Sequence, residues 1–143
     1  MKLRALVLDD SRVMRNMIMS ALRQSDTLEF EFVEGADGVE GLSKFDPKEI
    51  DIVFIDWNMP NMSGIEFARK VRAMKSANHI PLIMITSEKT MGKVEIALND
   101  AGVNAYISKP FTPKELHFKV TKVLESRGDK EKKSSGFFSK LMG

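Results

Sequence analysis

Short apolar segments alternate five times with longer amphipathic segments along this 143-residue chain. Each apolar segment has the length of a β-strand, and each amphipathic segment repeats apolar residues at helical spacing. This alternation predicts an α/β fold in which helices cover both faces of a parallel sheet, because parallel strands need long crossover connections. The predicted strands are residues 3–8, 28–33, 50–55, 81–85 and 104–107.

The apolar content of these runs predicts their places in the sheet. Residues 50–55 and 81–85 are apolar nearly throughout, which is typical of strands buried on both faces. The run 28–33 instead alternates glutamate with phenylalanine, from Glu29 to Phe32, as a strand with one solvent-facing side does. We therefore place that strand at an edge of the sheet.

Apolar stripes and capping signals predict the helices between and after the strands. Asp37 with Glu40, and Thr112 with Glu115, have the spacing of a capping box, and Pro113 suits a first helical position. The start of the last helix is therefore the best-defined boundary in the sequence. The predicted helical segments are 13–21, 37–45, 67–74, 94–101 and 113–124.

Composition narrows the chemistry open to the chain. Hydrophobic residues make up 43% and charged residues 29%, which is typical of a globular domain and unlike a disordered chain. There is no cysteine and there are two histidines, so disulfides, thiolate zinc sites and cysteine nucleophiles are excluded and a histidine metal cage is disfavoured. A metal site must therefore use oxygen ligands.

Charge is distributed unevenly between a predicted domain, residues 1–126, and a predicted tail, residues 127–143. The tail holds five Lys or Arg and two Asp or Glu, a net charge of +3, so the whole-chain charge of +2 leaves −1 for the domain. A domain with this charge is not globally basic, and we expect no nucleic-acid partner. The first apolar run is too short for a signal peptide or a membrane span, so we expect a cytoplasmic protein.

The tail is predicted to be a charged, flexible linker followed by a short hydrophobic end. Phe137, Phe138, Leu141 and Met142 would share one face of a helix, but so short a helix is not stable alone in water. Two interpretations stay open. The tail is either a disordered end or a docking peptide that recruits a partner or folds against its own domain.

Polar residues follow four of the five predicted strands. In an open α/β sheet the carboxyl ends of the strands form the ligand-binding edge, so these residues are the candidate site. Three carboxylates, a threonine hydroxyl and a lysine ammonium are expected to converge there. The segments are Asp9-Asp10-Ser11, Asp56-Trp57-Asn58-Met59-Pro60, Thr86-Ser87 and Ser108-Lys109-Pro110.

Three neighbouring carboxylates repel one another, so a hard divalent cation is their natural partner. Mg²⁺ prefers one or two protein carboxylates together with water and phosphate oxygens, and this set of residues offers that arrangement. The chemistry to expect is phosphoryl transfer, with Asp56 as nucleophile, Lys109 paired with a phosphoryl oxygen and Thr86 donating to another. Asp9-Asp10, Thr86 and Lys109 would each alone be more easily explained as a turn, strand-end or surface residue. The Asp56 motif is harder to explain as a simple turn, because Asp56 closes a run expected to be a buried central strand, and the four motifs in order carry the interpretation.

These four motifs, together with Gly64 and Phe111, resemble those of the response-regulator receiver family, in particular its CheY-like single-domain members, over about residues 3–126. The resemblance implies a flavodoxin-like fold with strand order 2-1-3-4-5. It also implies phosphorylation of Asp56 to 4-aspartylphosphate and a cis bond between Lys109 and Pro110. The implied metal ligands are Asp10, Asp56 and the backbone carbonyl of Asn58, with Asp9 acting through water.

The same resemblance assigns residues to the switch and to its timing. Thr86 and Tyr106 are the implied switch pair, and Asn58 and Glu88 occupy positions that tune the reaction rates. The implied output face consists of the fourth helix, the fifth strand and the fifth helix, and includes Tyr106 and Lys119. Tyr106 also fits ordinary packing on an edge strand.

The expected function is a phosphorylation switch in two-component signalling, with chemotaxis as the expected pathway. The implied phosphodonor is a CheA-like histidine kinase or a histidine phosphotransfer protein, and the chain would act as a phosphoacceptor and not as an enzyme with its own substrate turnover. Three alternatives stay open: a phosphorelay intermediate, a non-motility receiver whose tail recruits a partner, and a phosphorylation-independent binding module.

Two other protein classes fit the residues less well. Phosphohydrolases with an aspartate nucleophile carry an Asp-x-Asp motif after the first strand, and Asp9-Asp10-Ser11 lacks that spacing. A flavodoxin-like FMN carrier needs backbone N–H groups around a phosphate at that place, where two aspartates would repel the anion.

Overall fold

A five-stranded parallel sheet forms the centre of the computed structural model, which describes residues 2–132, with side chains described as far as Ser126. The strand order β2-β1-β3-β4-β5 confirms the expected flavodoxin-like topology, and β2 lies at an edge as its alternating sequence predicts. The strands are β1 (Lys2–Leu8), β2 (Glu29–Gly35), β3 (Ile52–Ile55), β4 (Leu82–Thr86) and β5 (Ala105–Ser108).

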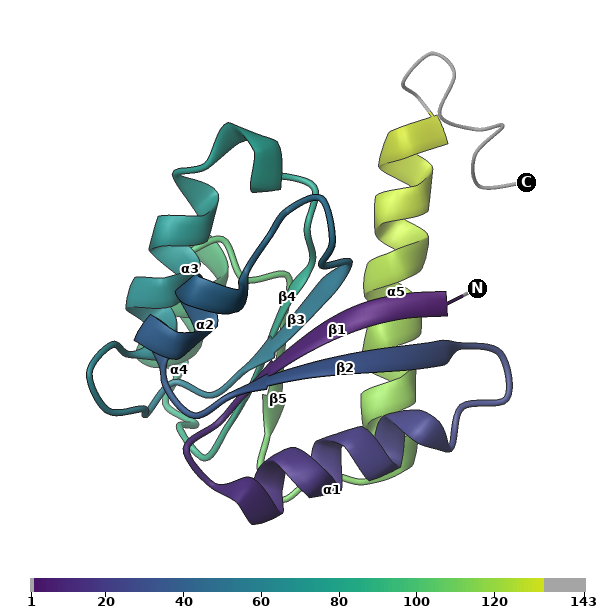
Figure 1. Ribbon diagram of the computed structural model, residues 1–143, viewed down its shortest axis with the longest axis horizontal. Helices are drawn as coiled ribbons and strands as arrows, with labels where there is room; N and C mark the ends of the chain where they lie inside the picture. The colour runs from purple at the N-terminus through teal and green to yellow at the C-terminus, as the bar shows by residue number, and fades with distance from the viewer. Residues whose placement is uncertain (1, 133–143) are drawn as a thin grey trace.

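Helices cover both faces of the sheet (Figure 1), as the alternation of segments predicts. Two of them, α1 and α5, pack on one face, and the other helices pack on the opposite face. The helices are α1 (Arg12–Arg23), α2 (Gly38–Lys44), α3 (Gly64–Arg72), α4 (Met91–Glu95), its π-helical continuation η2 (Ile96–Asp100), α5 (Pro113–Lys132) and the short 3-10 turn η1 (Lys75–Ala77).

The hydrophobic core consists of two layers separated by the sheet. The first layer packs Leu6, Val53 and Met84 against Phe67 of α3 and Ala97 of η2. The second layer is formed by the alternate residues of the strands, which pack against α1 and α5. Because successive strand residues point to opposite faces, a strand apolar throughout serves both layers, and this explains why β3 and β4 are buried along their whole length.

Strand register aligns the ends that carry the candidate site. Leu8 pairs with Ile55, and Thr86 pairs with Ser108. The residues that follow these pairs, Asp9, Asp56 and Lys109, are therefore brought to one edge of the sheet.

Capping residues fix the helix starts. Asp37 accepts a hydrogen bond from the backbone N–H of Glu40 at 2.7 Å, and Thr112 accepts one from Glu115 at 3.1 Å, as the sequence predicts. Ser63 and Glu66 form a complete capping box at the start of α3 that we did not predict, although its Ser-x-x-Glu spacing is visible in the sequence.

Helix α5 is longer than predicted and runs to Lys132, so the predicted linker does not begin at residue 127. Polar composition suggests a linker, but Arg, Lys and Glu are good helix formers and the segment contains no proline to end the helix. The hydrophobic end of the tail, from Phe137 to Met142, lies outside the described residues.

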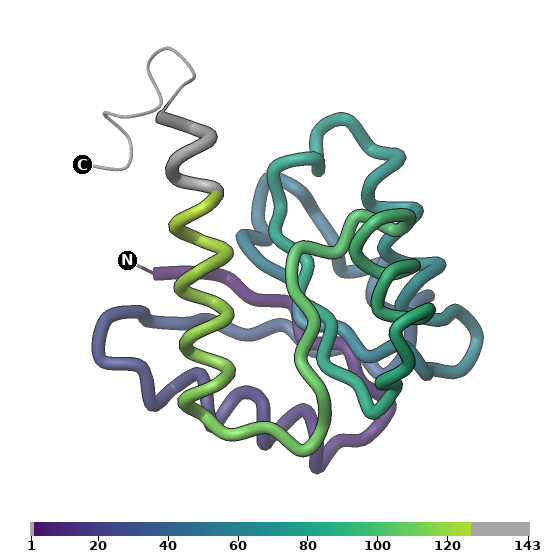
Figure 2. The backbone as a smooth tube through the Cα atoms, turned by 180° about the vertical axis from the view of Figure 1, so that it is seen from behind, coloured from purple at the N-terminus to yellow at the C-terminus, as the bar shows by residue number. Residues whose placement is uncertain are grey.

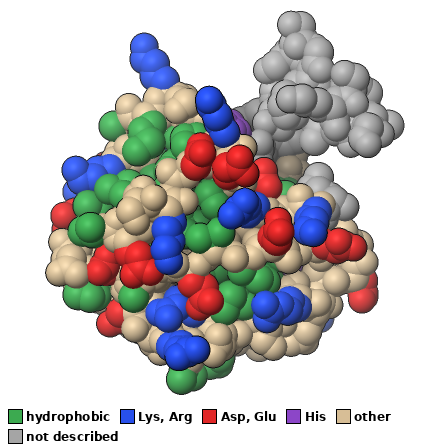
Figure 3. All heavy atoms as spheres, in the orientation of Figure 1, with side chains coloured by type: hydrophobic (Ala, Val, Ile, Leu, Met, Phe, Trp, Pro, Cys, Tyr) green, Lys and Arg blue, Asp and Glu red, His purple; other side chains and the backbone are tan. Residues whose placement is uncertain are grey.

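Positive and negative side chains are interspersed over the face seen in Figure 3. Within the part of the chain that the structure describes, no helix combines the length and the apolar character needed to cross a membrane.

Candidate functional site

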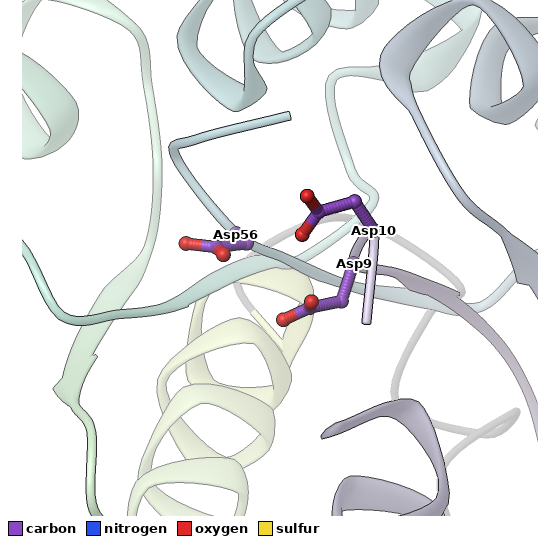
Figure 4. A group of neighbouring side chains, drawn as sticks. All are labelled: Asp9, Asp10 and Asp56. Atoms are coloured by element: carbon purple, nitrogen blue, oxygen red, sulfur yellow. The ribbon is translucent and has the colours of Figure 1, made fainter. Parts of the chain in front are cut away.

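The predicted site residues meet where β1, β3, β4 and β5 end. Asp9 and Asp10 follow β1, Asp56 follows β3, Thr86 is the last residue of β4 and Lys109 follows β5. Figure 4 shows the three carboxylates projecting to the same side of the backbone. One ligand atom from each aspartate lies within 4.8 Å of the others, so the sheet brings together the predicted acidic cluster.

Lys109 joins two of the three carboxylates. Its Nζ donates to Asp9 Oδ2 at 2.8 Å and to Asp56 Oδ2 at 3.1 Å. Asp9 and Asp56 are buried, whereas Asp10 is exposed at the mouth of the cluster. The cluster therefore has a cation at its base and an open carboxylate at its entrance.

Burial and hydrogen bonding oppose each other at these groups. Burial raises the pKa of Asp9 above its ordinary value, and this outweighs the hydrogen bonds from Lys109 and from the Ser11 backbone, which act to lower it. Burial acts to lower the pKa of Lys109, but the hydrogen bonds to Asp9 and Asp56 reverse the effect and the pKa is raised. Lys109 is therefore held as a cation while Asp9 carries an unfavourable charge.

One oxygen of Asp56 has no protein partner. Asp56 Oδ2 accepts from Lys109, while Asp56 Oδ1 is the single buried side-chain polar atom without a hydrogen bond among the residues described. A buried acceptor without a partner is costly unless a ligand satisfies it. This free oxygen and the neighbouring carboxylates fit a hard divalent cation such as Mg²⁺.

Arg15 of α1 secures the loop that carries Asp9 and Asp10, a role that sequence reasoning missed. Its Nη1 donates to the backbone carbonyl of Asp9 at 2.7 Å, and its Nε donates to Glu34 at 3.0 Å. The Asp9 N–H donates in turn to the Gly35 carbonyl at 3.2 Å. The loop is thus tied to both α1 and the edge strand β2, which fixes the direction of its carboxylates.

Glu88 connects the predicted switch residue Tyr106 with the predicted rate-tuning residue Asn58. The Tyr106 hydroxyl donates to the Glu88 carbonyl at 2.7 Å, and the Asn58 amide donates to the Glu88 carboxylate at 2.9 Å. Thr86, which is fully buried, accepts a 3.4 Å hydrogen bond from the Glu88 N–H. The four predicted residues therefore form one connected group between β4 and α4.

Lys93 completes this group from the first turns of α4. Its Nζ donates to Glu88 at 2.8 Å and lies 5.5 Å from the centre of the Trp57 ring. Hydrogen bonds from Asn58 and then from Lys93 hold the pKa of Glu88 below its ordinary value, so the carboxylate stays charged. The sequence did not predict this contact of Lys93, because the contact depends on where α4 starts.

The phenol of Tyr106 is expected to titrate late. Burial, followed by the charges of Glu88 and Asp56, raises its pKa from 10.0 to about 12. The folded protein keeps this proton above the pH at which the unfolded chain loses it, so the stabilisation is complete below pH 10 and is lost between pH 10 and about 12. Tyr106 is the only tyrosine, so the near-ultraviolet absorbance of phenolate gives its titration directly. A midpoint at the ordinary value would contradict this environment.

Replacing Lys109 with methionine is expected to destabilise the fold by about 3–5 kcal/mol without metal, because two buried carboxylates lose their cation. Urea denaturation should show the loss, and addition of Mg²⁺ should reduce it. The difference from wild type should also shrink as the pH falls, since protonated carboxyl groups need no cation. A loss that neither Mg²⁺ nor acid reduces would mean that packing of the lysine stem, and not its charge, is what matters.

Comparison with known proteins agrees with this geometry. The profile of the response regulator receiver domain matches residues 5–121. The chemotaxis protein CheY homolog of Campylobacter jejuni is 42% identical over 125 residues, which cover 85% of this chain and 92% of that protein. Chemotaxis protein CheY1 of Helicobacter pylori strain J99 is 44% identical over 126 residues, with coverage of 85% and 97%.

Solved structures give the same result. The chemotaxis response regulator CheY4 of Vibrio cholerae matches with a TM-score of 0.77 at 30% identity, and the match covers 86% of this chain and 99% of that one. The cis peptide bond between Lys109 and Pro110, which the resemblance implied, is also present. With a profile that spans most of its length and relatives above 40% identity, the chain belongs to the response regulator receiver family, among its CheY-like members.

Proposed function

We propose that this chain accepts a phosphoryl group on Asp56 from a phosphohistidine, with Mg²⁺ bound at the acidic cluster, and passes the signal to a partner protein. The observation that supports the proposal best is the free oxygen of Asp56. Asp56 Oδ1 is buried without a hydrogen bond, while Oδ2 is oriented by Lys109. An oriented carboxylate with one uncommitted oxygen is what a nucleophile at phosphorus requires.

In the proposed transfer, an oxygen of Asp56 forms a bond to phosphorus as the phosphorus–nitrogen bond breaks, and the imidazole nitrogen keeps the bonding electrons. As negative charge moves from the Asp56 carboxylate to a phosphoryl oxygen, the Lys109 ammonium donates a hydrogen bond to that oxygen. It can do so because it already lies within hydrogen-bonding distance of Asp56. The Thr86 hydroxyl donates a hydrogen bond to another phosphoryl oxygen. The product is an acyl phosphate, so the chain acts as a stoichiometric phosphoacceptor and not as an enzyme.

Mg²⁺ would neutralise charge on the transferring phosphoryl group. We assign Asp10, Asp56 and the backbone carbonyl of Asn58 as its ligands, with Asp9 acting through water. Asp10 is exposed, and Asp56 carries the free buried oxygen Oδ1. Both residues can therefore bind a cation while Asp56 Oδ2 keeps its hydrogen bond from Lys109 Nζ. Asp9 is less available because both of its oxygens already accept hydrogen bonds.

The output of the switch is proposed to leave through Tyr106 and Thr86. If the Thr86 hydroxyl turns toward a phosphoryl oxygen, its 3.4 Å contact with the Glu88 N–H is weakened. The Glu88 carbonyl is the acceptor of the Tyr106 hydroxyl, so the phenol responds to the same change. Tyr106 lies on the face formed by α4, β5 and α5, where we place the output partner.

Chemotaxis is the proposed pathway, because the two sequence relatives described above and the Vibrio structure all carry chemotaxis names. The proposed phosphodonor is a CheA-like histidine kinase or a histidine phosphotransfer protein, and the proposed site of action is the cytoplasm. The acceptor chemistry at Asp56 is the same for a relay intermediate, so pathway and chemistry are tested separately.

Fluorescence of Trp57 tests the chemistry. Trp57 is the only tryptophan and follows Asp56 directly, so its emission reports on the site. We expect Mg²⁺ to change the emission, and acetyl phosphate or beryllofluoride to change it further only when Mg²⁺ is present. If Mg²⁺ and the phosphoryl analogues leave the emission unchanged, and mass spectrometry finds no phosphorylated protein, the chain is a phosphorylation-independent binding module.

A further inference from the structure

Several hollows border helix α5 in the described part of the chain, and the one beside α4 is larger than those beside α1 and β2. This hollow, the α4–α5 groove, has a volume of about 580 Å³ and is lined chiefly by Val94, Leu98, Tyr106, Phe118, Lys122 and Val123. Figure 2 shows α5 and the α4 region on either side of β5. Residues of β5 and α5, together with Val94 and Leu98, line the groove. The hollow beside α1 has a volume of about 390 Å³ and the hollow beside β2 about 220 Å³.

The groove exposes large apolar side chains. Phe118 is 59% exposed and Leu98 is 38% exposed. Lys122 lies 5.5 Å from the Phe118 ring centre and covers only part of it. A hollow with exposed aromatic and aliphatic side chains of this kind marks a binding surface in a folded domain.

The chain itself supplies a segment of matching chemistry. Residues 133–143 follow the described part of α5 and carry four large apolar side chains: Phe137, Phe138, Leu141 and Met142. Their spacing would place all four on one face of a short helix, and such a face becomes stable only when it is buried against another surface. The segment is therefore stable as a helix only against an apolar surface, and the exposed apolar side chains of the groove provide one.

Chain length decides which hollow the segment reaches. From Lys132 to the level of Val123 is nine helical residues, or about 14 Å, and five extended residues bring Phe137 about 17 Å from Lys132. From Lys132 to the level of Phe118 is about 21 Å, and four helical residues beyond Phe137 add about 6 Å, so Leu141 can lie about 23 Å from Lys132. Both apolar pairs of the segment therefore reach the groove.

The two other hollows fit less well. The hollow beside α1 includes Phe111 and Pro113 at the opposite end of α5, about 28 Å from Lys132, which is beyond the reach of both Phe137 and Leu141. The hollow beside β2 lies within reach, but it is the smaller one and its lining includes Thr27, Thr121 and Glu125. Reach and size together select the α4–α5 groove.

We propose that residues 137–142 fold back into the α4–α5 groove of their own chain and cover it until an output partner displaces them. The location of that partner rests on the proposed function, but the contact itself does not require phosphorylation. The segment would compete with the partner as a tethered ligand, so its effective concentration is set by a short connection to α5. Removing its phenylalanines should increase partner binding without changing phosphoryl acceptance.

A spin label tests the contact in the full chain without phosphodonor. The sequence has no cysteine, so Ser139→Cys gives a single attachment site for a nitroxide. We expect the label to weaken the amide signals of Val94, Leu98 and Phe118 in spectra of ¹⁵N-labelled protein. The matched control carries Phe137→Ser and Phe138→Ser with the same label, and it should recover those signals.

Each other outcome of the spin-label experiment would overturn the proposal. Equal signals with and without the phenylalanines mean that the groove is empty or is covered by something else. Signal loss confined to Thr27 and Leu28 places the segment beside β2. Signal loss in a mixture of spin-labelled ¹⁴N protein and ¹⁵N protein without the spin label means that a second copy is the occupant. Loss of phosphoryl acceptance in the Trp57 assay, with the contact intact, would count against the proposed function alone.

Discussion

Asp56→Asn is expected to abolish the fluorescence response of Trp57 to acetyl phosphate and beryllofluoride. The amide keeps the shape of the side chain and can still accept from Lys109, but it offers no carboxylate oxygen for a bond to phosphorus. The variant should remain folded, because removing one negative charge from a cluster of three relieves repulsion. Loss of the fluorescence response in a variant of unchanged stability would identify Asp56 as the acceptor.

The control for this experiment is Asp100→Asn, which removes an exposed carboxylate at the end of η2, away from the cluster. This variant should respond as wild type does. Phosphorylation of the Asp56→Asn protein at a similar rate, detected by mass spectrometry, would show that another residue accepts the phosphoryl group. If the variant protein is weakly phosphorylated at Asp10 alone, Asp56 remains the principal acceptor provided that the wild-type protein is phosphorylated on Asp56.

Gly64→Ala is expected to lower the free energy of unfolding by more than about 3 kcal/mol, at the upper end of the cost of overpacking. A Cβ atom on Gly64 would lie 2.0 Å from the backbone carbonyl oxygen of Asp56, and a backbone atom cannot rotate away as a side chain can. Gly64 has an ordinary φ, so the reason for glycine here is the close approach and not the turn. The displaced residue is Asp56 itself, so phosphoryl acceptance should fall as well.

Gly92→Ala is the matched control. Gly92 lies in α4, and a Cβ atom there would meet nothing within 4 Å. Alanine should therefore stabilise the protein by about 0.5–1 kcal/mol through helix propensity. Urea denaturation of both variants checks the pair. Equal stability of Gly64→Ala and wild type would mean that the loop after β3 can move without cost, and that it does not hold Asp56 in place.

The sequence predicted the sheet and the residues at its edge because both follow from local rules. The apolar runs at 50–55 and 81–85 could be stable only as central strands, and the alternation at Glu29 to Phe32 could be stable only at an edge. Once the strands are parallel, their final residues share one edge whatever the details of the helices. Asp9, Asp56 and Lys109 could therefore be placed together from the sequence alone.

The contacts of Arg15 and Lys93 could not be predicted in the same way. Each depends on a helix being rotated so that one long side chain reaches a particular acceptor, and periodicity does not fix that rotation closely enough. The end of α5 was missed for a different reason, since charged residues are equally common in linkers and in exposed helices. The free oxygen of Asp56 is visible only when all its neighbours have been placed.

Under the proposed function, Glu88 would give the duration of a signal and its delivery a common origin. Its carboxylate accepts hydrogen bonds from Asn58 and Lys93, and its backbone carbonyl accepts one from the hydroxyl of Tyr106. Because Asn58 and Lys93 anchor the Glu88 side chain, we expect a substitution at Glu88 to alter both the lifetime of the phosphorylated state and the position of the backbone carbonyl that holds Tyr106. A slower or faster response would then require paired substitutions. One at Glu88 would change the lifetime of the phosphorylated state, and a second on the output face would restore partner binding.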